Sequence, residues 1–150
     1  MIAPPPVRTV TPHSLRSARL ALIYVPNANA IEPVTSGCCG RFHLGLGGRD
    51  AGALSLVGKS AGHAVIGYEI KLEFRRQGLA TEAVAALMKA ARGFGLTLLS
   101  AQCRSDNLAS LGVLEKNGFE LASSTPWQID GDSTRHYLVY QWTAARTMQR

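Results

Sequence analysis

The residues best placed to do chemistry lie at positions 66–84, where the chain reads IGYEIKLEFRRQGLATEAV. An apolar run ends at Ile70, and after a short polar stretch a helical pattern opens around Gly78. The first-turn N–H groups of a helix have no partner and lie at the positive end of its dipole, so they attract anions. Gly78 leaves space beside them, and Arg75 and Arg76 add charge. The segment predicts a pyrophosphate site, although a glycine used only for close helix–sheet packing gives the same pattern.

A second polar cluster begins a further helical pattern. Asp106 or Asn107 can cap this helix at its N-terminus. The Asn-Gly pair at 117–118 ends it, and Phe119 is placed to make the hydrophobic contact of a Schellman cap. Ser110 follows Asn107 at i+3, so both side chains share one helix face. Asn107 and Ser110 are therefore candidates to meet a ligand together, or else a simple cap and a surface hydroxyl.

Positions 52–60 read GALSLVGKS and imitate a phosphate-binding P-loop. A P-loop needs four residues between its first glycine and the Gly-Lys pair, and a helix directly after it. Here five residues separate them, and residues 61–70 have the pattern of a strand. Lys59 is therefore expected in the turn of a β-hairpin.

These candidates must be positioned by a sheet and helices. Residues 1–14 are expected to be extended or frayed, and 26–40 to form a loop or short helix. The predicted strands are 19–25, 42–46, 53–57, 64–70, 97–103, an irregular strand after the second helix, and 135–142. Helical spacing over 76–92 predicts the long helix, which glycines 93 and 95 stop. We expect an antiparallel meander followed by a strand–helix–strand–helix unit, all within one domain spanning 1–150.

Composition narrows the class of protein. Of 150 residues, 46% are hydrophobic and 17% charged, which is typical of a soluble globular domain. The net charge of +6 favours anionic partners, but no run of five basic residues indicates a nucleic-acid surface. No apolar stretch approaches the roughly 20 residues of a membrane span, and the run at 20–25 is too short for a secretory signal.

The cysteines argue against a metal or disulfide protein. Cys38, Cys39 and Cys103 are odd in number and show no CxxC spacing. Cys38 and Cys39 have His43 nearby, but a fourth ligand at usable spacing is missing. We therefore expect no metal and a reducing, cytoplasmic location.

Two motifs resemble a known family. Arg-x-x-Gly-x-Ala at 75–80, followed by Thr-Glu-Ala, resembles motif A of the GNAT N-acetyltransferase superfamily. Residues 106–110 (DNLAS) and 114–119 (LEKNGF) resemble motif B of its ribosomal-protein N-terminal, or Rim-type, branch. The resemblance covers about residues 65–119. It implies an α/β (α+β) GNAT fold: a mixed, mostly antiparallel, twisted sheet flanked by helices, with a shortened N-terminal helical region.

The resemblance also implies a chemistry: direct transfer of an acetyl group from acetyl-CoA to a primary amine, on a protein N-terminus or a small molecule, without a metal. The strand ending at residues 69–70 would part from its neighbour and pair with the pantetheine arm. The cofactor-binding residues would be Ile70, Arg75, Arg76, Gln77, Gly78, Leu79, Ala80 and Asn107.

Two positions depart from the family pattern. Many relatives carry a glutamate as general base where this chain has Gln102, and a tyrosine as general acid where it has Leu114. In the Rim-type branch a serine matching Ser110 is the proposed stand-in for the acid. Glu69 could replace the base, directly or through a water, or could be an ordinary strand residue. Further candidates for proton transfer are His136 and Tyr137.

The N-terminal region is also short for the family, which normally places two helices between its first two strands. Only residues 26–40 are available, so the acceptor wall is a short helix or loop, or a second subunit of a homodimer supplies it. The missing glutamate and tyrosine leave open a non-catalytic acyl-CoA-binding or sensing domain on the same fold. A nucleic-acid-binding protein rests on charge alone, since no basic face with interleaved aromatics is present.

Overall fold

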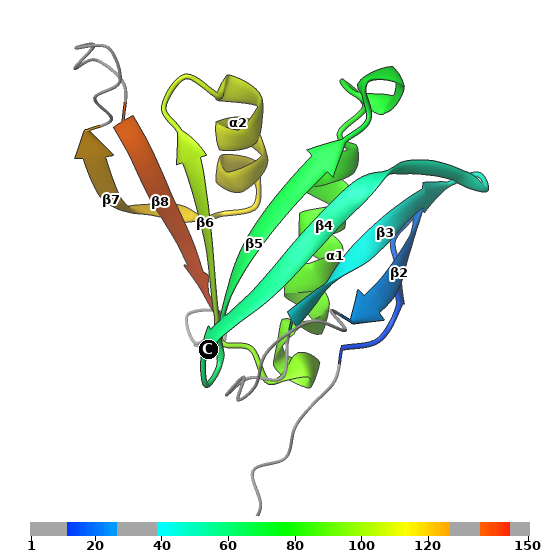
Figure 1. Cartoon of the computed structure of the whole chain (residues 1–150), viewed down its shortest axis with the longest axis horizontal. Coiled ribbons are helices and arrows are strands. Elements are labelled where there is room, and N and C mark those ends of the chain that lie inside the picture. The colour runs from blue at the N-terminus through cyan, green and yellow to red at the C-terminus, as the bar shows by residue number, and fades with distance from the viewer. Residues whose placement is uncertain (1–11, 27–38, 127–135, 145–150) are drawn as a thin grey trace, which may run out of the picture.

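The computed structural model describes residues 12–26, 39–126 and 136–144, which form an eight-stranded sheet and two α-helices (Figure 1). The strand order is β1-β2-β3-β4-β5-β6-β8-β7, and only the β5–β6 pair is parallel. The strands are β1 Leu15–Arg16, β2 Leu20–Pro26, β3 Cys39–Leu46, β4 Arg49–Ser60, β5 His63–Ile70, β6 Leu98–Arg104, β7 Glu120–Pro126 and β8 His136–Thr143. The helices are α1 Leu79–Ala90 and α2 Leu108–Lys116, with short 3-10 turns at Leu72–Phe74 and Ala91–Phe94. The mixed, mostly antiparallel sheet confirms the predicted fold class.

The first strands form the predicted meander, but they are longer than their apolar runs. The strand predicted at 53–57 extends over Arg49–Ser60, and β3 begins at Cys39 inside the predicted loop 26–40. Apolar alternation marks only the buried part of a strand, whereas ladder hydrogen bonds continue through its polar ends. Gly47 and Gly48, both with positive φ, make the two-residue turn between β3 and β4. The short β1 was not predicted, and residues 27–38, expected to hold the shortened helical region, lie outside the described residues.

The imitation of a P-loop is a strand. Residues 52–60 lie in β4, which continues through the turn at residues 61–62 into β5. Lys59 is part of β4 just before this turn, not in the turn itself. No helix follows, so the structure confirms that this segment is a hairpin.

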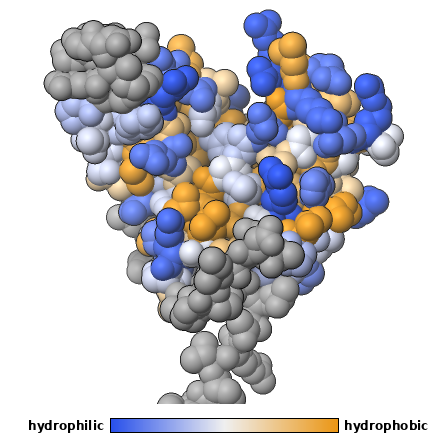
Figure 2. All heavy atoms as spheres, in the orientation of Figure 1, coloured by the Kyte–Doolittle hydropathy of each residue, from blue (hydrophilic) through white to orange (hydrophobic). Residues whose placement is uncertain are grey.

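Both helices cover one face of the sheet. They lie behind it in the view of Figure 1, and α1 contacts β1, β2 and β5. Alternate strand residues point toward them, which places Leu22, Phe42 and Leu54 in the core with Val84 and Leu87 of α1. On the opposite face, turned toward the viewer in Figure 2, apolar side chains gather over the centre. The exposed apolar residues there are Ile23, Val25 and Val57.

The helix boundaries show which local signals held. The second helix is capped by Asn107, whose Oδ1 accepts from the Ser110 N–H at 3.1 Å. At its end, Phe119 N–H donates to the Leu114 carbonyl and Gly118 N–H to that of Glu115, the pattern of a Schellman cap. The cap prediction is therefore confirmed.

The predicted start of the long helix was wrong. We expected it at residue 76, but α1 begins at Leu79. Arg76 and Gly78 have φ of 66° and 75°, in the left-handed region, and neither can continue a right-handed helix. Residues 76–78 are therefore a separate turn in front of α1. At the far end the helix passes into the 3-10 turn Ala91–Phe94.

The strands β5 and β6 part in the middle of the sheet. Their parallel pairing runs from His63↔Leu98 to Ile66↔Ala101 and then stops, although β5 continues to Ile70. In Figure 1 the two strands diverge, with α2 at the opening, and Figure 2 shows the surface hollowed between the same two halves. The half of β5 beyond Ile66 therefore has no strand partner on its β6 side.

Neither α1 nor any other helix within the described ranges has the length and apolar character needed to span a membrane.

Candidate active site

Two connected hollows lie where β5 and β6 part. A cavity of about 320 Å³ opens between the strands, with Gly67 and Tyr68 on one side and Gln102 and Cys103 on the other. A groove of about 630 Å³ runs from the last residues of β5, past the start of α1, to α2. Tyr68, Asn107 and Ser110 line both. The two hollows thus form one path from the left-handed turn to the gap between the strands.

The groove collects most of the residues that the sequence singled out for the cofactor. The predicted cofactor residues in its lining are Ile70, Arg75, Arg76, Gly78, Leu79, Ala80 and Asn107. Of the predicted cofactor residues, only Gln77 is not in the lining of the groove. Arg75 is additionally held in place, because its Nε donates to the Ile70 carbonyl at 2.9 Å. Arg75 and Arg76 are both exposed, so their charges are available to an anion.

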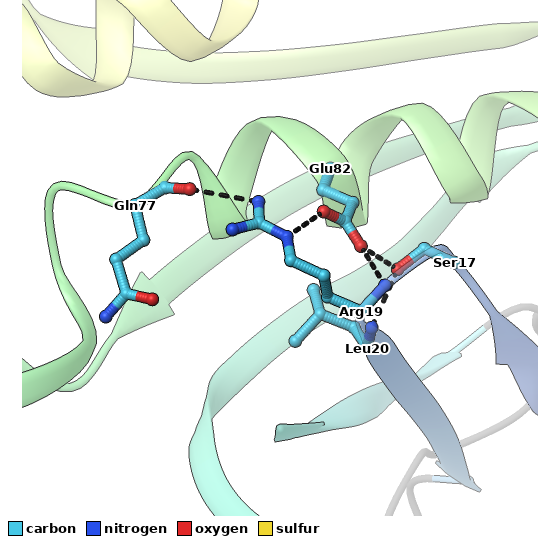
Figure 3. A network of polar contacts seen from close by, with 5 residues as sticks. All are labelled: Ser17, Arg19, Leu20, Gln77 and Glu82. Atoms are coloured by element: carbon cyan, nitrogen blue, oxygen red, sulfur yellow. Dashed lines mark hydrogen bonds and ion pairs between the residues drawn. The ribbon is translucent and has the colours of Figure 1, made fainter. Parts of the chain in front are cut away.

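The turn before α1 is anchored by contacts from the far edge of the sheet (Figure 3). Arg19, between β1 and β2, donates from Nη2 to the Gln77 carbonyl at 2.9 Å and from Nε to Glu82 Oε1 at 2.7 Å. Glu82 Oε2 also accepts from the Arg19 N–H at 2.7 Å and from the Ser17 hydroxyl. We call Ser17, Arg19 and Glu82 the Arg19 clamp. It fixes the carbonyl of Gln77 and therefore the turn that presents Gly78 to the groove.

The charge of Glu82 is matched to this role. Burial alone would raise the pKa of Glu82, but hydrogen bonds from Ser17 and Arg19 and the Arg19 charge outweigh it and hold the pKa below its ordinary value. The carboxyl is therefore ionised at neutral pH and accepts each of these bonds.

Asn107 and Ser110 lie together on the first turn of α2, as their spacing predicts. The Asn107 Oδ1 is used as the helix cap, so only its side-chain amide N–H groups are available to a ligand in the groove. Ser110 is half-buried and lines both hollows. Asn107 and Ser110 thus form the N-terminal cap of α2 and also line the groove.

Tyr68 is a polar residue of this site that the sequence did not single out. Its Oη is 2.8 Å from Ser110 Oγ and donates to the Ser110 carbonyl at 3.1 Å. Burial raises the pKa of Tyr68, and the hydrogen bond to Ser110 offsets only part of this. Tyr68 therefore keeps its proton at neutral pH. The sequence held one signal for it. Tyr68 alternates with Ile66 and Ile70, so it shares their face of β5, the strand that was expected to part from its neighbour.

Cys103 completes the polar cluster around Ser110. Burial raises the pKa of the Cys103 thiol, and a hydrogen bond with Ser110 lowers it by less. A thiol held protonated is a poor nucleophile. Cys103 is therefore a protonated thiol at neutral pH.

Glu69 lies on the other face of β5. Side chains alternate along a strand, so Glu69 points away from the helices that Tyr68 contacts. It is exposed and lines both the groove and an adjoining pocket of about 490 Å³ with Arg41 and His43. Glu69 and Ser110 therefore both line the groove, although by strand alternation the Glu69 side chain is on the face of β5 opposite the one that contacts Ser110.

Of the remaining candidates for proton transfer, one lines the cavity and the other does not. Tyr137 lines the cavity between the strands. His136 lines neither hollow, and its Nδ1 contacts Ser124 at 3.2 Å. Gln102 is exposed at the cavity, and Leu114 is fully buried in the core, so neither supplies an ionisable group there.

Among the described residues, no group of three or more His, Cys, Asp or Glu side chains could hold a metal ion. Of the cysteine pair considered from the sequence, Cys39 is a free, half-buried thiol in β3 and Cys38 lies outside the described residues.

The sequence of residues 19–120 matches the acetyltransferase (GNAT) domain family over more than half of the chain. The chain belongs to the GNAT acetyltransferase family. The matched residues of this GNAT domain include the parted strands β5 and β6 and the left-handed turn before α1. Among curated proteins, none matches the chain by sequence.

Solved structures similar to this GNAT domain include Rim-type enzymes. RimL, a ribosomal L7/L12 alpha-N-protein acetyltransferase in complex with coenzyme A, is 27% identical with a TM-score of 0.64; the match covers 71% of this chain and 63% of RimL. The acetyltransferase of Salmonella typhimurium that modifies the N-terminal serine of 50S protein L7/L12 is 27% identical, with a TM-score of 0.62, over 71% of this chain and 64% of its own. RimJ of Mycobacterium smegmatis in complex with CoA-disulfide is 20% identical, with a TM-score of 0.71, over 92% and 90%.

The two structures at 27% identity support the Rim-type branch. RimJ, at 20% identity, supports the fold alone. The matched part of this chain spans less than two thirds of the two longer enzymes, RimL and its Salmonella counterpart.

Proposed function

We propose that this protein transfers the acetyl group of acetyl-CoA directly to a primary amine. The observation that carries the proposal is the parting of β5 from β6 next to an anchored turn with two left-handed residues. The RimL neighbour, solved with coenzyme A, supports the donor. The amine class is supported by the same neighbours, which acetylate protein N-termini by name.

The groove has the features that coenzyme A requires. Beyond Ile66 the β5 backbone has no strand partner on its open side, so it can pair with the two amides of the pantetheine arm. The first-turn N–H groups of α1, beside Gly78, Arg75 and Arg76, suit the pyrophosphate. Asn107 lines both the groove and the cavity, and in this proposal its amide N–H groups bind the cofactor near its thiol end.

The two faces of β5 divide the chemistry. Glu69 faces the pocket with Arg41 and His43, so an amine entering there can lose its proton to the carboxylate, directly or through water. Ser110 and Tyr68 contact each other on the opposite face, and in this proposal the sulfur leaves beside them. Most of the acceleration comes from holding donor and acceptor together and from strand amides that polarise the thioester carbonyl.

The test is turnover of acetyl-CoA, followed as release of free thiol, with a panel of small amines and peptides that differ in their N-terminal residue. We expect saturable turnover with one class and none without an acceptor. Tight binding of acetyl-CoA with no turnover across the panel contradicts catalysis and indicates the acyl-CoA-sensing alternative.

A further inference from the structure

Tyr68 and Ser110 join two elements across the opening of the sheet. They are 42 residues apart in sequence, on β5 and α2, and their hydroxyl oxygens are 2.8 Å apart. Either hydroxyl can be the donor in this pair. Tyr68 has one hydroxyl proton, so in the relay it is donated to Ser110 Oγ in place of the Ser110 carbonyl, which is 3.1 Å away. Both residues line the cavity between the strands and the groove. The pair therefore lies at the place where, in the proposed reaction, the coenzyme A sulfur leaves.

Serine alone is poorly matched to protonating a leaving thiolate. A proton donor works best when its acidity is close to that of the group it protonates. A phenol has a pKa of about 10 and a thiol about 8.5, whereas an aliphatic hydroxyl is a far weaker acid. Ser110 can pass a proton on readily only if another group restores it at the same time.

We propose that Tyr68 supplies the proton that Ser110 passes to the departing sulfur. This inference rests on the acetyl transfer proposed above. When the carbon–sulfur bond breaks, its electron pair goes to the sulfur, which takes the Ser110 hydroxyl proton. Ser110 Oγ takes the Tyr68 proton in the same step. The resulting phenolate is reprotonated from water, which balances the proton that the nitrogen loses as the amide forms. The proton that the acceptor ammonium gives up before attack is released to solvent as the net proton of the reaction.

Other groups near Ser110 fit this role less well. Leu114, at the position where many relatives carry a tyrosine, is fully buried and lines neither hollow. Gln102 has no ionisable proton at neutral pH. Cys103 lines the cavity with Ser110 but is itself buried among apolar side chains. Tyr68 is half-buried and lines both hollows, so water can restore its proton.

The first measurement separates rate from binding. Tyr68→Phe keeps the ring and removes only the hydroxyl. We expect a loss of kcat of roughly tenfold to a hundredfold, with the acetyl-CoA dissociation constant changed less than about threefold, within 0.7 kcal/mol. Because the two hydroxyls act as a unit, Tyr68→Phe/Ser110→Ala should be no slower than the slower single variant. Tyr140→Phe is the matched control, since this buried tyrosine bonds Glu115 on the same helix and lines neither hollow.

The second measurement uses a better leaving group. In the acetyl selenoester of coenzyme A a selenide leaves, and a selenol is much more acidic than a thiol. We expect Tyr68→Phe and Ser110→Ala to approach the wild-type rate with this donor. A variant damaged only in packing or in substrate position would stay slow with both donors. Ser110→Ala, whose helix-surface change is small, serves the same test if Tyr68→Phe does not fold.

Four outcomes overturn the inference: full activity of Tyr68→Phe, a weakened acetyl-CoA affinity that accounts for its defect, multiplicative defects in the double variant, or a defect that persists with the selenoester. A wild-type protein that binds acetyl-CoA without turnover would instead overturn the proposed function, and the inference with it.

Discussion

Among single residues, Glu69 carries the proposed removal of the acceptor's proton. It is exposed on the face of β5 opposite Ser110, in the pocket with Arg41 and His43. Its structural neighbour across the ladder is Ala53, which leaves space beside the carboxylate. The position suits a base that acts on an amine arriving from the uncovered face of the sheet.

Replacing Glu69 by Gln should therefore lower kcat/KM by about tenfold to a hundredfold below the pKa of the acceptor amine. The remaining activity should follow the ionisation of the amine itself, because no other described carboxylate replaces Glu69 on β5. Rates measured over a range of pH for both proteins check this. Glu73→Gln is the control, since Glu73 is exposed and lines the same pocket. Coinciding profiles of wild type and Glu69→Gln would make Glu69 an ordinary strand residue.

At the scale of elements, the turn at residues 76–78 and the start of α1 form the anion site. A non-glycine residue in the left-handed region, such as Arg76, costs about 1–3 kcal/mol and persists only where the surroundings hold it. The Arg19 clamp provides this constraint through the Gln77 carbonyl. The site is thus prepared before the ligand arrives.

Gly78→Glu should weaken acetyl-CoA binding by several kcal/mol, at tenfold for each 1.4 kcal/mol. The carboxylate enters the space proposed for the phosphates, and a left-handed φ of 75° disfavours the new side chain. Gly78→Asn separates the two effects, because asparagine tolerates this conformation and adds no charge. Calorimetry on folded variants should show a large loss for Glu and a small one for Asn. Unchanged affinity in Gly78→Glu would remove the phosphate site from this turn. Gly93→Glu, in open space on the 3-10 turn, adds the same charge elsewhere.

Arg19→Gln should loosen the same turn from a distance. Without the bonds from Arg19 to Gln77 and Glu82, the turn at residues 76–78 is held less firmly in its left-handed conformation. Acetyl-CoA must then restore that conformation when it binds, which costs binding free energy. We expect the acetyl-CoA dissociation constant to rise by roughly tenfold, about 1.4 kcal/mol, while kcat at saturating acetyl-CoA changes little. Arg16→Gln, on neighbouring β1, removes the same charge from a residue outside the clamp. Equal effects of the two substitutions would mean that only the overall charge matters.

For the whole molecule, Glu82 links the far edge of the sheet to α1, which covers the core. Its pKa in the folded state is below the ordinary value, so the folded state binds fewer protons than the unfolded state in this range. The stabilisation is complete above the ordinary pKa of 4.5 and is lost as the pH falls through the lowered value. Acid should therefore weaken this link between sheet and helix.

Urea unfolding at neutral pH and at a series of pH values below 4.5 checks this. Wild type should lose stability over this range, and Glu82→Gln should start less stable and lose less, since its clamp bonds are already weakened. Asp50→Asn is the comparison: it breaks the exposed Asp50–Lys71 pair, which solvent and salt screen, so its effect on stability should be small. An equal acid dependence in wild type and Glu82→Gln would contradict the role of the clamp in stability.

The sequence by itself determined the features that depend on neighbours along the chain. The apolar alternation marked β3, β4 and β5, and Asn107 and the Asn-Gly pair marked both ends of α2, because strand faces and helix caps are decided within a few residues. The motif around Gly78 also named most of the residues that line the groove.

The tertiary structure alone decided where these pieces meet. Residues 76–78 had a helical pattern, yet Arg19, 58 residues before Gln77, contacts the turn that they form instead. Tyr68 and Ser110 come together over 42 residues because α2 lies at the parting of β5 from β6. Contacts between residues this far apart leave no periodic pattern in the sequence, because the intervening chain fixes neither the distance between the two residues nor their relative orientation. For this reason the binding turn could be located from the sequence, whereas its anchor and the proton partner of Ser110 could not.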